Sequence, residues 1–508
     1  MNSVSMPKDK TTKYIYYVVV MLVCVLVSLA PMVTVGILVL VVAGLLLTWM
    51  VVKRPFWIVL LLTIYLPFET ICLNLLPPNS TIYLAAQFSS EIIIYYALIF
   101  QIIRKIICRK ILTTTPIDRP LIGFIILAIA TTLLNHTPIL GSIVNLRALL
   151  RYVFLFYLVV NLDIKPQKAQ LLLRIILIIG MIQIIVGAGQ LLFGEAINKF
   201  LLPQAVNLEI AGQARNFRLL TGGREIGSIF GTLGDTVFFS LYMLLALALH
   251  LGRIKKLTPA NSVITAIILI AGGYSYARAT IFGMILTIIT FHLIYDKTKK
   301  IYLIAITTLP IAVIGTFLLL NTVLASSEYV NPVQKEQSIL ANITGIFSKR
   351  YLEIARKQRL ESLLNTAPTI LLNHPFLGYG PDKKTAIEKL NHSYPTYLSR
   401  PLIDKGFEDV YWVALLTYYG TIGVGILIII LGILLSSAHK IYKSTDTQII
   451  QTLAVAVTCL TSTTFFLLFF NQALEYRVYS YFFWLLPALM YKLYSQETIY
   501  NASNIATN

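Results

Sequence analysis

Two histidines lie in a stretch of this sequence that has the residue types of an enzyme loop. The stretch, residues 373–400, reads NHPFLGYGPDKKTAIEKLNHSYPTYLSR, whereas the sequence around it is rich in Leu, Ile and Val. A histidine has an unperturbed pKa of about 6.5, so it can take a proton from a hydroxyl group near neutral pH. Glycines such as Gly378 and Gly380 allow the backbone to turn sharply. We therefore treat His374 and His392 as candidates for a catalytic base.

Arg278 is a candidate for binding an anion. It lies in GGYSYARATIFGMIL, between two apolar runs with almost no loop, so we expect it at a membrane boundary. An arginine at that depth is costly unless it meets an anion or a water-filled cavity. The alternative is a side chain that reaches toward the lipid headgroups.

A second arginine-containing segment precedes another apolar run. It reads ARNFRLLTGGREIGSIFGTLGD and contains Arg218 and Arg224. We expect Asp235 to lie within the apolar run that follows and to pair with an arginine of this segment. Guanidinium groups carry a fixed charge and a fork of donors, so they can stabilise a phosphate leaving group without a metal.

The composition places these residues in a membrane protein. Of the 508 residues, 57% are hydrophobic and 12% are charged, about half the charged share of a typical soluble domain. Crossing a bilayer takes about 20 apolar residues in a helix. The apolar runs that we read as spans are 14–30, 32–52, 56–77, 91–107, 120–135, 148–163, 170–193, 228–251, 259–276, 279–295, 301–323, 410–437, 448–470 and 479–494. The sequence therefore predicts an all-α polytopic membrane protein with about 12–14 transmembrane helices.

The charges predict the orientation of these helices. Lysine and arginine gather in alternate connections, which the positive-inside rule places in the cytoplasm together with both termini. The formal net charge of +19 is thereby explained without a nucleic-acid partner. The predicted parts are an N-terminal bundle of about eleven spans at 1–323, a large outer loop at 324–409, further transmembrane helices at 410–494 and a cytoplasmic tail at 495–508.

A basic helix is predicted inside the large outer loop. Residues 348–364, SKRYLEIARKQRLESLL, combine arginines and lysines with leucines that can pack. The helix could lie along an anionic membrane surface, or residues such as Arg359 could help to hold a phosphate-bearing substrate. We prefer the first interpretation for most of these charges.

Several common catalytic motifs are absent from the sequence. It contains no P-loop, no GxSxG, no HExxH and no Asp-x-Asp, and its four cysteines lack metal-type spacing. ATP-driven and metal-dependent chemistry are therefore disfavoured, and we expect neither a metal nor a cofactor.

The outer loop resembles the signature of the bacterial O-antigen ligase and O-antigen polymerase family. The resemblance rests on HPFLGYGPD followed by NHSYPTYLSRPLIDKGFEDVYWVALLTYYGTIGVG, and it is specific over about 350–430. SYARAT and RLLTGGREIGSIFGTLGD resemble two arginine-containing elements of the same family. The resemblance implies a metal-independent, inverting glycosyltransferase of the GT-C type in the bacterial inner membrane, with its active site on the periplasmic face.

The resemblance also implies roles for the matching residues. The family's catalytic histidine corresponds to His392, which precedes Tyr397, and its hairpin arginine corresponds to Arg278. A second pyrophosphate-binding arginine corresponds to Arg224 or Arg218, and we prefer Arg224 because a glycine follows three residues later.

The remaining loop residues are assigned supporting roles. We expect His374 to order the turn before Pro375 rather than to react. The supporting set is His374, Gly378, Gly380, Tyr397, Arg359 and Asp235.

The function implied is transfer or polymerisation of a glycan linked to undecaprenyl pyrophosphate. The acceptor would be a lipid-anchored sugar or another lipid-linked repeat unit, and membrane lipids would surround the enzyme. The sequence leaves open a ligase, a polymerase and a protein-directed oligosaccharyltransferase. A different class, a polysaccharide flippase or transporter, is the alternative.

Overall fold

The computed structural model describes most of the helical part of the chain. The described residues are 35–77, 80–193, 197, 201, 217–219, 225–227, 229–254, 258–275, 277–294, 362–393 and 410–507. The chain divides into two compact units, Met1–Leu61 and Leu62–Asn508. The first unit contributes α2 (Val35–Lys53) and the start of α3 (Pro55–Tyr65).

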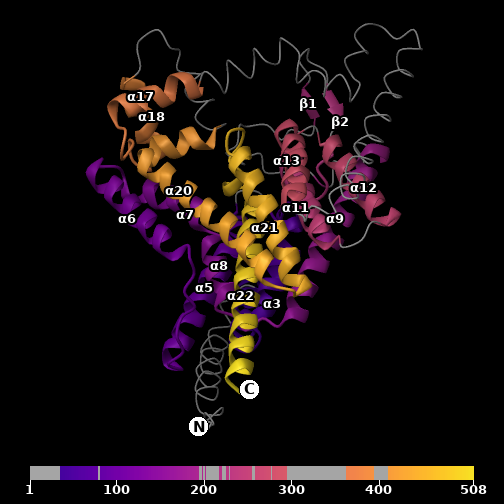
Figure 1. Ribbon diagram of the computed structural model, residues 1–508. Helices are drawn as coiled ribbons and strands as arrows, with labels where there is room; N and C mark the ends of the chain where they lie inside the picture. Colours follow the sequence, from indigo (N-terminus) through magenta and orange to yellow (C-terminus); the bar gives the residue numbers. More distant parts are fainter. Residues whose placement is uncertain are drawn as a thin grey trace, which may run out of the picture. The chain divides into compact units, whose positions relative to one another are not determined.

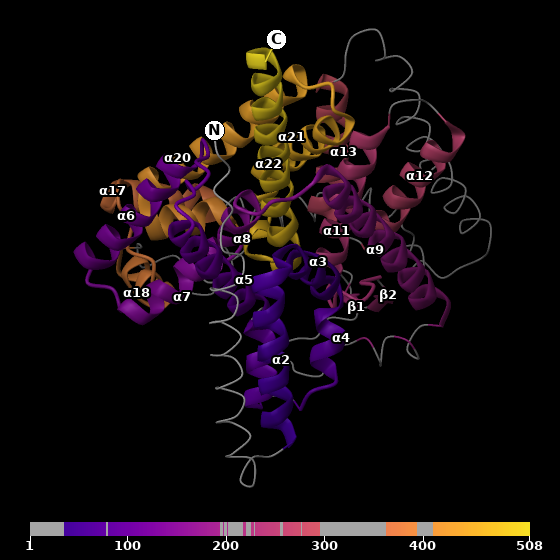
Figure 2. The same cartoon turned by 90° about the horizontal axis from the view of Figure 1, so that it is seen from below.

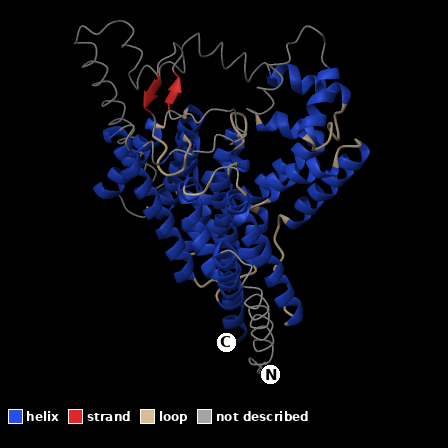
Figure 3. Ribbon diagram, turned by 180° about the vertical axis from the view of Figure 1, so that it is seen from behind, coloured by secondary structure: helices blue, strands red, loops and turns tan. Residues whose placement is uncertain are grey.

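The regular elements among the described residues of the second unit are helices and one short pair of strands (Figures 1 and 3). Its helices before the strands are η2 (Leu66–Phe68), α4 (Glu69–Asn74), α5 (Thr81–Ile107), α6 (Asp118–Leu134), α7 (Ile139–Leu150), α8 (Val153–Val160) and α9 (Pro166–Phe193). Those after the strands are α11 (Thr236–Arg253), α12 (Pro259–Tyr274), α13 (Arg278–Ile294), η7 (Ser362–Thr366), α17 (Ala367–Asn373), α18 (Lys383–Ser393), α20 (Tyr411–Ser444), α21 (Gln448–Leu467), η8 (Ala473–Glu475) and α22 (Arg477–Thr507). Strands β1 (Phe217–Leu219) and β2 (Glu225–Gly227) are antiparallel.

Six of the described helices are long and apolar enough to cross a membrane, which confirms the helical membrane class. They are Pro55–Asn74, Ile82–Ile107, Pro166–Phe193, Thr236–Arg253, Tyr411–Ser444 and Gln448–Leu467. Helices α7 and α8 meet at an angle of 51° and together could form a seventh, broken span. The spans expected at 14–30 and 301–323 lie outside the described residues.

Helix α21 packs against α11, α13, α20 and α22, and Figure 2 shows it between α22 and α13. Lipid tails are as apolar as leucine side chains, so the hydrophobic effect does not drive helices together inside a bilayer. Hydrogen bonds between hydroxyl groups help to join these helices. The Ser240 hydroxyl donates to Thr280 Oγ1 over 2.9 Å, and the Thr287 and Thr463 hydroxyls are also 2.9 Å apart. Close packing and polar contacts therefore hold this core together.

The structure corrects one of the expected boundaries. The run expected to span from residue 228 becomes helical only at Thr236, because residues 229–235 form a buried loop. Gln190 Oε1 accepts hydrogen bonds from the Phe230 and Gly231 amides, which satisfies backbone groups that lipid could not. Residues 495–507, which the sequence analysis assigns to the cytoplasmic tail, continue α22 as helix.

Candidate functional site

The stretch that contains both candidate histidines is built into a membrane-spanning helix. Helix α20 is interrupted at Gly420, whose backbone has φ 61° and ψ −166°. The turn between α17 and α18, residues 374–382, lies in this interruption. We call these residues the docked turn.

The docked turn replaces the hydrogen bonds that α20 loses at its break. In an unbroken helix, Thr421 N–H would donate to the Thr417 carbonyl, four residues earlier. Here the Thr417 carbonyl accepts from Tyr379 N–H over 2.7 Å, and Thr421 N–H donates to the Pro375 carbonyl over 2.8 Å. An unpaired backbone group at membrane depth costs several kcal/mol, so this exchange makes the break tolerable.

The next pair of backbone groups makes the same exchange. The Tyr418 carbonyl accepts from Gly380 N–H over 3.2 Å, and Ile422 N–H donates to the Phe376 carbonyl over 3.4 Å. Two carbonyls and two amides of the broken helix are thus satisfied by one short turn.

Both glycines of the GYG sequence are required by this geometry. Gly378 and Gly380 have φ of 63° and 99°, a region that residues with a side chain rarely adopt. A Cβ on Gly378 would overlap the Thr417 carbonyl, and one on Gly380 would overlap the Thr137 side chain. The structure therefore gives these two predicted site residues a positioning role.

Helix α18, which carries His392 in its last turn, is fixed to α7 and to the end of α6. The Asn145 side chain donates to the Pro381 carbonyl over 2.7 Å. Lys389 Nζ donates to the Asn135 carbonyl over 2.7 Å. Asp382 Oδ2 accepts from the Thr385 amide over 2.9 Å at the start of the helix. His392 itself is exposed, so its imidazole can reach a molecule bound from solution.

His374 ends α17 and packs on the docked turn. Its ring lies 4.6 Å from the Tyr379 ring, and its backbone carbonyl accepts from Gly378 N–H over 3.1 Å. Partial burial and the nearby Lys389 ammonium lower the pKa of His374 below its usual value. An imidazole that packs against the Tyr379 ring at a tilt of 56° fits the role in ordering the turn.

The other predicted site residues are described only in part. Arg278 begins α13, which packs against α11, α12 and α21, whereas α18 packs against α7, α17 and α20. No contact in the described part of the chain joins His392 to Arg278. The backbone of Arg218 lies in β1. The residues outside the description are Arg224, Tyr397, Arg359 and the side chains of Arg218 and Arg278.

Asp235 does not have the position that the sequence suggested. It lies just before α11 and acts as its N-cap, where Oδ1 accepts from the Val237 amide over 2.6 Å. A carboxylate at this position satisfies an otherwise free helix amide and favours the positive end of the helix dipole. The expectation that Asp235 lies within the span was therefore wrong, and the Val237 amide of α11 donates to it. The arginine side chains expected to pair with it lie outside the described residues.

A group of five charged side chains, of which Glu69, Glu91 and Arg151 are buried, was missed by the sequence reasoning. We call Glu69, Glu91, Arg147, Arg151 and Arg477 the buried charge cluster. Arg477 Nη1 lies 2.9 Å from Glu69 Oε1, while Arg151 Nη1 and Arg147 Nη1 lie 3.3 Å and 3.4 Å from the Glu91 carboxylate. Glu91 is only 1% exposed. Each carboxylate compensates an arginine that could not be buried alone.

The cluster extends toward the docked turn through α7 and η8. Arg151 Nη2 donates to the Glu475 backbone carbonyl over 3.2 Å. Burial raises the pKa of the Glu475 carboxyl to about 7, although Arg151 and Lys383 act to lower it. Because Lys383 begins α18, the helix that carries His392 is electrostatically linked to the cluster.

A signal for the cluster was present in the sequence. Glu69, Glu91, Arg147 and Arg151 all lie in or beside apolar runs, and an ionisable residue in such a run is a candidate functional residue. Their partners could not be found from spacing, because the two residues of the Glu69–Arg477 pair are 408 positions apart.

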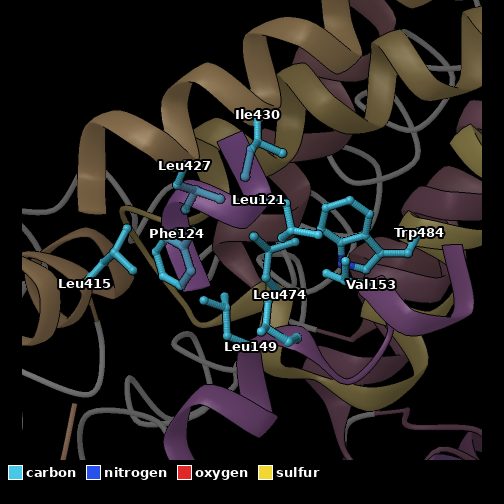
Figure 4. Close-up of a pocket in the computed structure, with 10 residues that line it drawn as sticks. Leu121, Phe124, Leu149, Val153, Leu415, Leu427, Ile430, Leu474 and Trp484 are labelled. Atoms are coloured by element: carbon cyan, nitrogen blue, oxygen red, sulfur yellow. The ribbon is translucent and has the colours of Figure 1, made fainter. Parts of the chain in front are cut away.

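An apolar pocket lies between helices of the second unit (Figure 4). Its lining residues are Leu121, Phe124, Leu149, Leu150, Val153, Leu415, Leu427, Ile430, Leu474 and Trp484. A pocket lined in this way suits hydrocarbon and offers no group for acid–base chemistry.

The described residues hold no group of three or more His, Cys, Asp or Glu side chains that could bind a metal ion. No protein-family model matches the chain, and no curated protein matches it. The function is therefore argued from the docked turn, α18 and the charges around them.

Proposed function

We propose that the protein is a membrane glycosyltransferase that takes a glycan from undecaprenyl pyrophosphate and joins it to an acceptor hydroxyl. The observation that carries the proposal is the docked turn, which fixes the exposed His392 beside the membrane-spanning α20. A lipid-linked glycan has its reactive bond at such a boundary, because its tail lies in the bilayer and its head in water. The family resemblance of the same residues supports the proposal.

In the proposed reaction, His392 takes the proton of the acceptor hydroxyl. The acceptor oxygen then forms a bond to the anomeric carbon, and the bond from that carbon to the pyrophosphate oxygen breaks on the opposite face. The electron pair of the broken bond goes to the pyrophosphate. Arg278 and Arg224, with Arg218 as the alternative to Arg224, stabilise its charge. Inversion at the anomeric carbon follows from the single displacement.

The proposal includes the topology that the charges predict. Twelve to fourteen spans, cytoplasmic termini and a large periplasmic loop would place His392 on the periplasmic face of a bacterial inner membrane. The same side would then receive lipid-linked glycan that has already crossed the membrane.

The decisive variant is His392→Ala, assayed as purified protein with a lipid-linked repeat unit. We expect loss of glycan transfer with unchanged membrane insertion and elution volume. His439→Ala is the matched control, because His439 is also exposed but lies near the opposite end of α20. Normal product from His392→Ala would refute the assignment of the base.

The same assay separates the classes of acceptor. Lengthening of the lipid-linked glycan without another acceptor would indicate a polymerase, for an O-antigen or an exopolysaccharide. Product only with a lipid-anchored core sugar would indicate a ligase, and product only with a protein would indicate an oligosaccharyltransferase. Loss of activity with EDTA would contradict the metal-independent mechanism.

A polysaccharide flippase or transporter is the second candidate, because two observations favour it. The buried charge cluster places ionisable groups among membrane helices, and two spans are interrupted, α20 at Gly420 and α7–α8 at their bend. Both features occur at transport sites. Movement of a labelled lipid-linked glycan across protein-containing vesicles, without any change in glycan length, would favour this candidate.

A further inference from the structure

Helix α17 and the start of the docked turn expose large apolar side chains. Leu372 is 84% exposed and Phe376 is 66% exposed, and Leu371 is also exposed. We call Leu371, Leu372 and Phe376 the apolar patch. The sequence assigned these residues to a loop in water, where three neighbouring exposed side chains of this size would be unfavourable.

The depth of the patch is set by the helix to which it is attached. The Phe376 carbonyl accepts from Ile422 N–H, just after the break in α20. The part of α20 after the break, residues 421–444, has about the length needed to cross a bilayer, roughly 20 residues. A span formed by residues 421–444 would leave the hydrocarbon region at the break, and Phe376 would then lie at the same level.

The patch continues the surface that α20 presents to lipid. Ile422 is 43% exposed and Ile429, about two turns further along the same helix, is 54% exposed. Because Ile422 is hydrogen-bonded to Phe376 through the backbone, exposed apolar surface continues from α20 onto the docked turn and then onto α17. No charged residue occurs in α17, whose sequence is APTILLN.

The character of the surface changes at α18. This helix begins with Lys383 and Lys384, both exposed, and carries Glu388 and Lys389 further along. Apolar residues followed closely by lysines are the pattern of a segment that lies in a membrane interface, with its apolar side chains in the acyl region and its ammonium groups among the headgroups.

We infer that the apolar patch is inserted into the hydrocarbon of the adjacent leaflet, while α18 lies in the headgroup layer. The occupant of the patch is thus lipid, and the candidate loop is partly a membrane-embedded element. His392, at the far end of α18, is held in the layer where the polar head of a membrane lipid would lie.

The inference is tested by spin labels on the full chain in vesicles of phosphatidylethanolamine and phosphatidylglycerol. Native cysteines are replaced by serine, and Leu372→Cys and Phe376→Cys each carry a nitroxide. Collision with oxygen, which concentrates in hydrocarbon, is compared with collision with a water-soluble nickel chelate. Ile429→Cys is the lipid-facing control and Lys384→Cys is the headgroup control.

We expect the labels at 372 and 376 to prefer oxygen, as the label at 429 does, and the label at 384 to prefer the nickel chelate. Nickel accessibility at 372 and 376 equal to that at 384 would overturn the inference. Low accessibility of 372 and 376 to both reagents would also overturn it, because another protein surface would then cover the patch. Only variants with the elution volume and unfolding temperature of the parent are compared.

Discussion

Gly378 lies directly against Gly420, so the docked turn and the broken helix meet through two residues without side chains. A Cβ on Gly378 would lie 2.8 Å from the Gly420 backbone nitrogen, and a Cβ on Gly420 would overlap the Phe376 carbonyl. Both residues also have positive φ. The junction is therefore as close as two backbones can approach.

Substitution of either glycine by alanine should destabilise the protein. Backbone strain alone costs on the order of 1–3 kcal/mol at each position, and the overlap adds to it. We expect Gly378→Ala and Gly420→Ala to lower the apparent unfolding temperature in detergent by several degrees. The control is Gly425→Ala, in the same helix, where nothing lies within 4 Å of the added Cβ. Equal behaviour of Gly420→Ala and Gly425→Ala would contradict the structure of the break.

Glu475 should make stability depend on pH. Its pKa is raised from 4.5 to about 7 in the folded protein, so the folded state holds a proton that the unfolded state has lost between these values. The contribution of this carboxyl to the free energy of unfolding then falls as pH rises from about 4.5 to about 7, and it does not change above that range. In Glu475→Gln this contribution is absent.

The measurement compares the unfolding temperatures of Glu475→Gln and the wild type across this range. The unfolding temperature of Glu475→Gln should rise relative to that of the wild type as pH rises to about 7. Glu388→Gln, on the exposed side of α18, is the matched control for the loss of a carboxylate. A difference for Glu475→Gln that does not change with pH would show that this carboxyl is not the titrating group.

Asp235 provides a test of capping against ion pairing. An asparagine can still accept from the Val237 amide, whereas an alanine cannot, and loss of an N-cap costs about 1 kcal/mol. We expect Asp235→Asn to stay close to the wild type in unfolding temperature and Asp235→Ala to fall below it. If both variants fell equally, the charge of Asp235, and not its cap, would be what matters.

The helical class could be predicted because it depends on local composition. Runs of apolar residues about as long as a bilayer is thick identify α5, α9, α20 and α21 without knowledge of their neighbours. The break at Gly420 could not be predicted in this way, because glycines also occur within unbroken α20 at Gly425 and Gly432. Only the turn that supplies the missing hydrogen bonds distinguishes Gly420 from them.

The candidate site also combines residues that could be predicted from the sequence with residues that could not. The glycines and histidines of the loop were identified from their types and spacing. The buried charge cluster requires contacts between α4, α5, α7 and α22, which are far apart in the sequence. Asp235 was misplaced because hydropathy does not show where a helix begins within an apolar run. The transferase assignment and the roles of His392, Arg278 and Arg224 remain predictions.

The exchange of hydrogen bonds at Gly420 also has a consequence for biosynthesis. Pro375 and Thr421 are 46 residues apart, so the ribosome completes the turn well before the helix that will receive it. Until α20 emerges, the Tyr379 and Gly380 amides have no partner in that helix, and α20 in turn cannot bend at Gly420 without unpaired groups. We therefore expect insertion of this span to be coupled to folding of the loop before it.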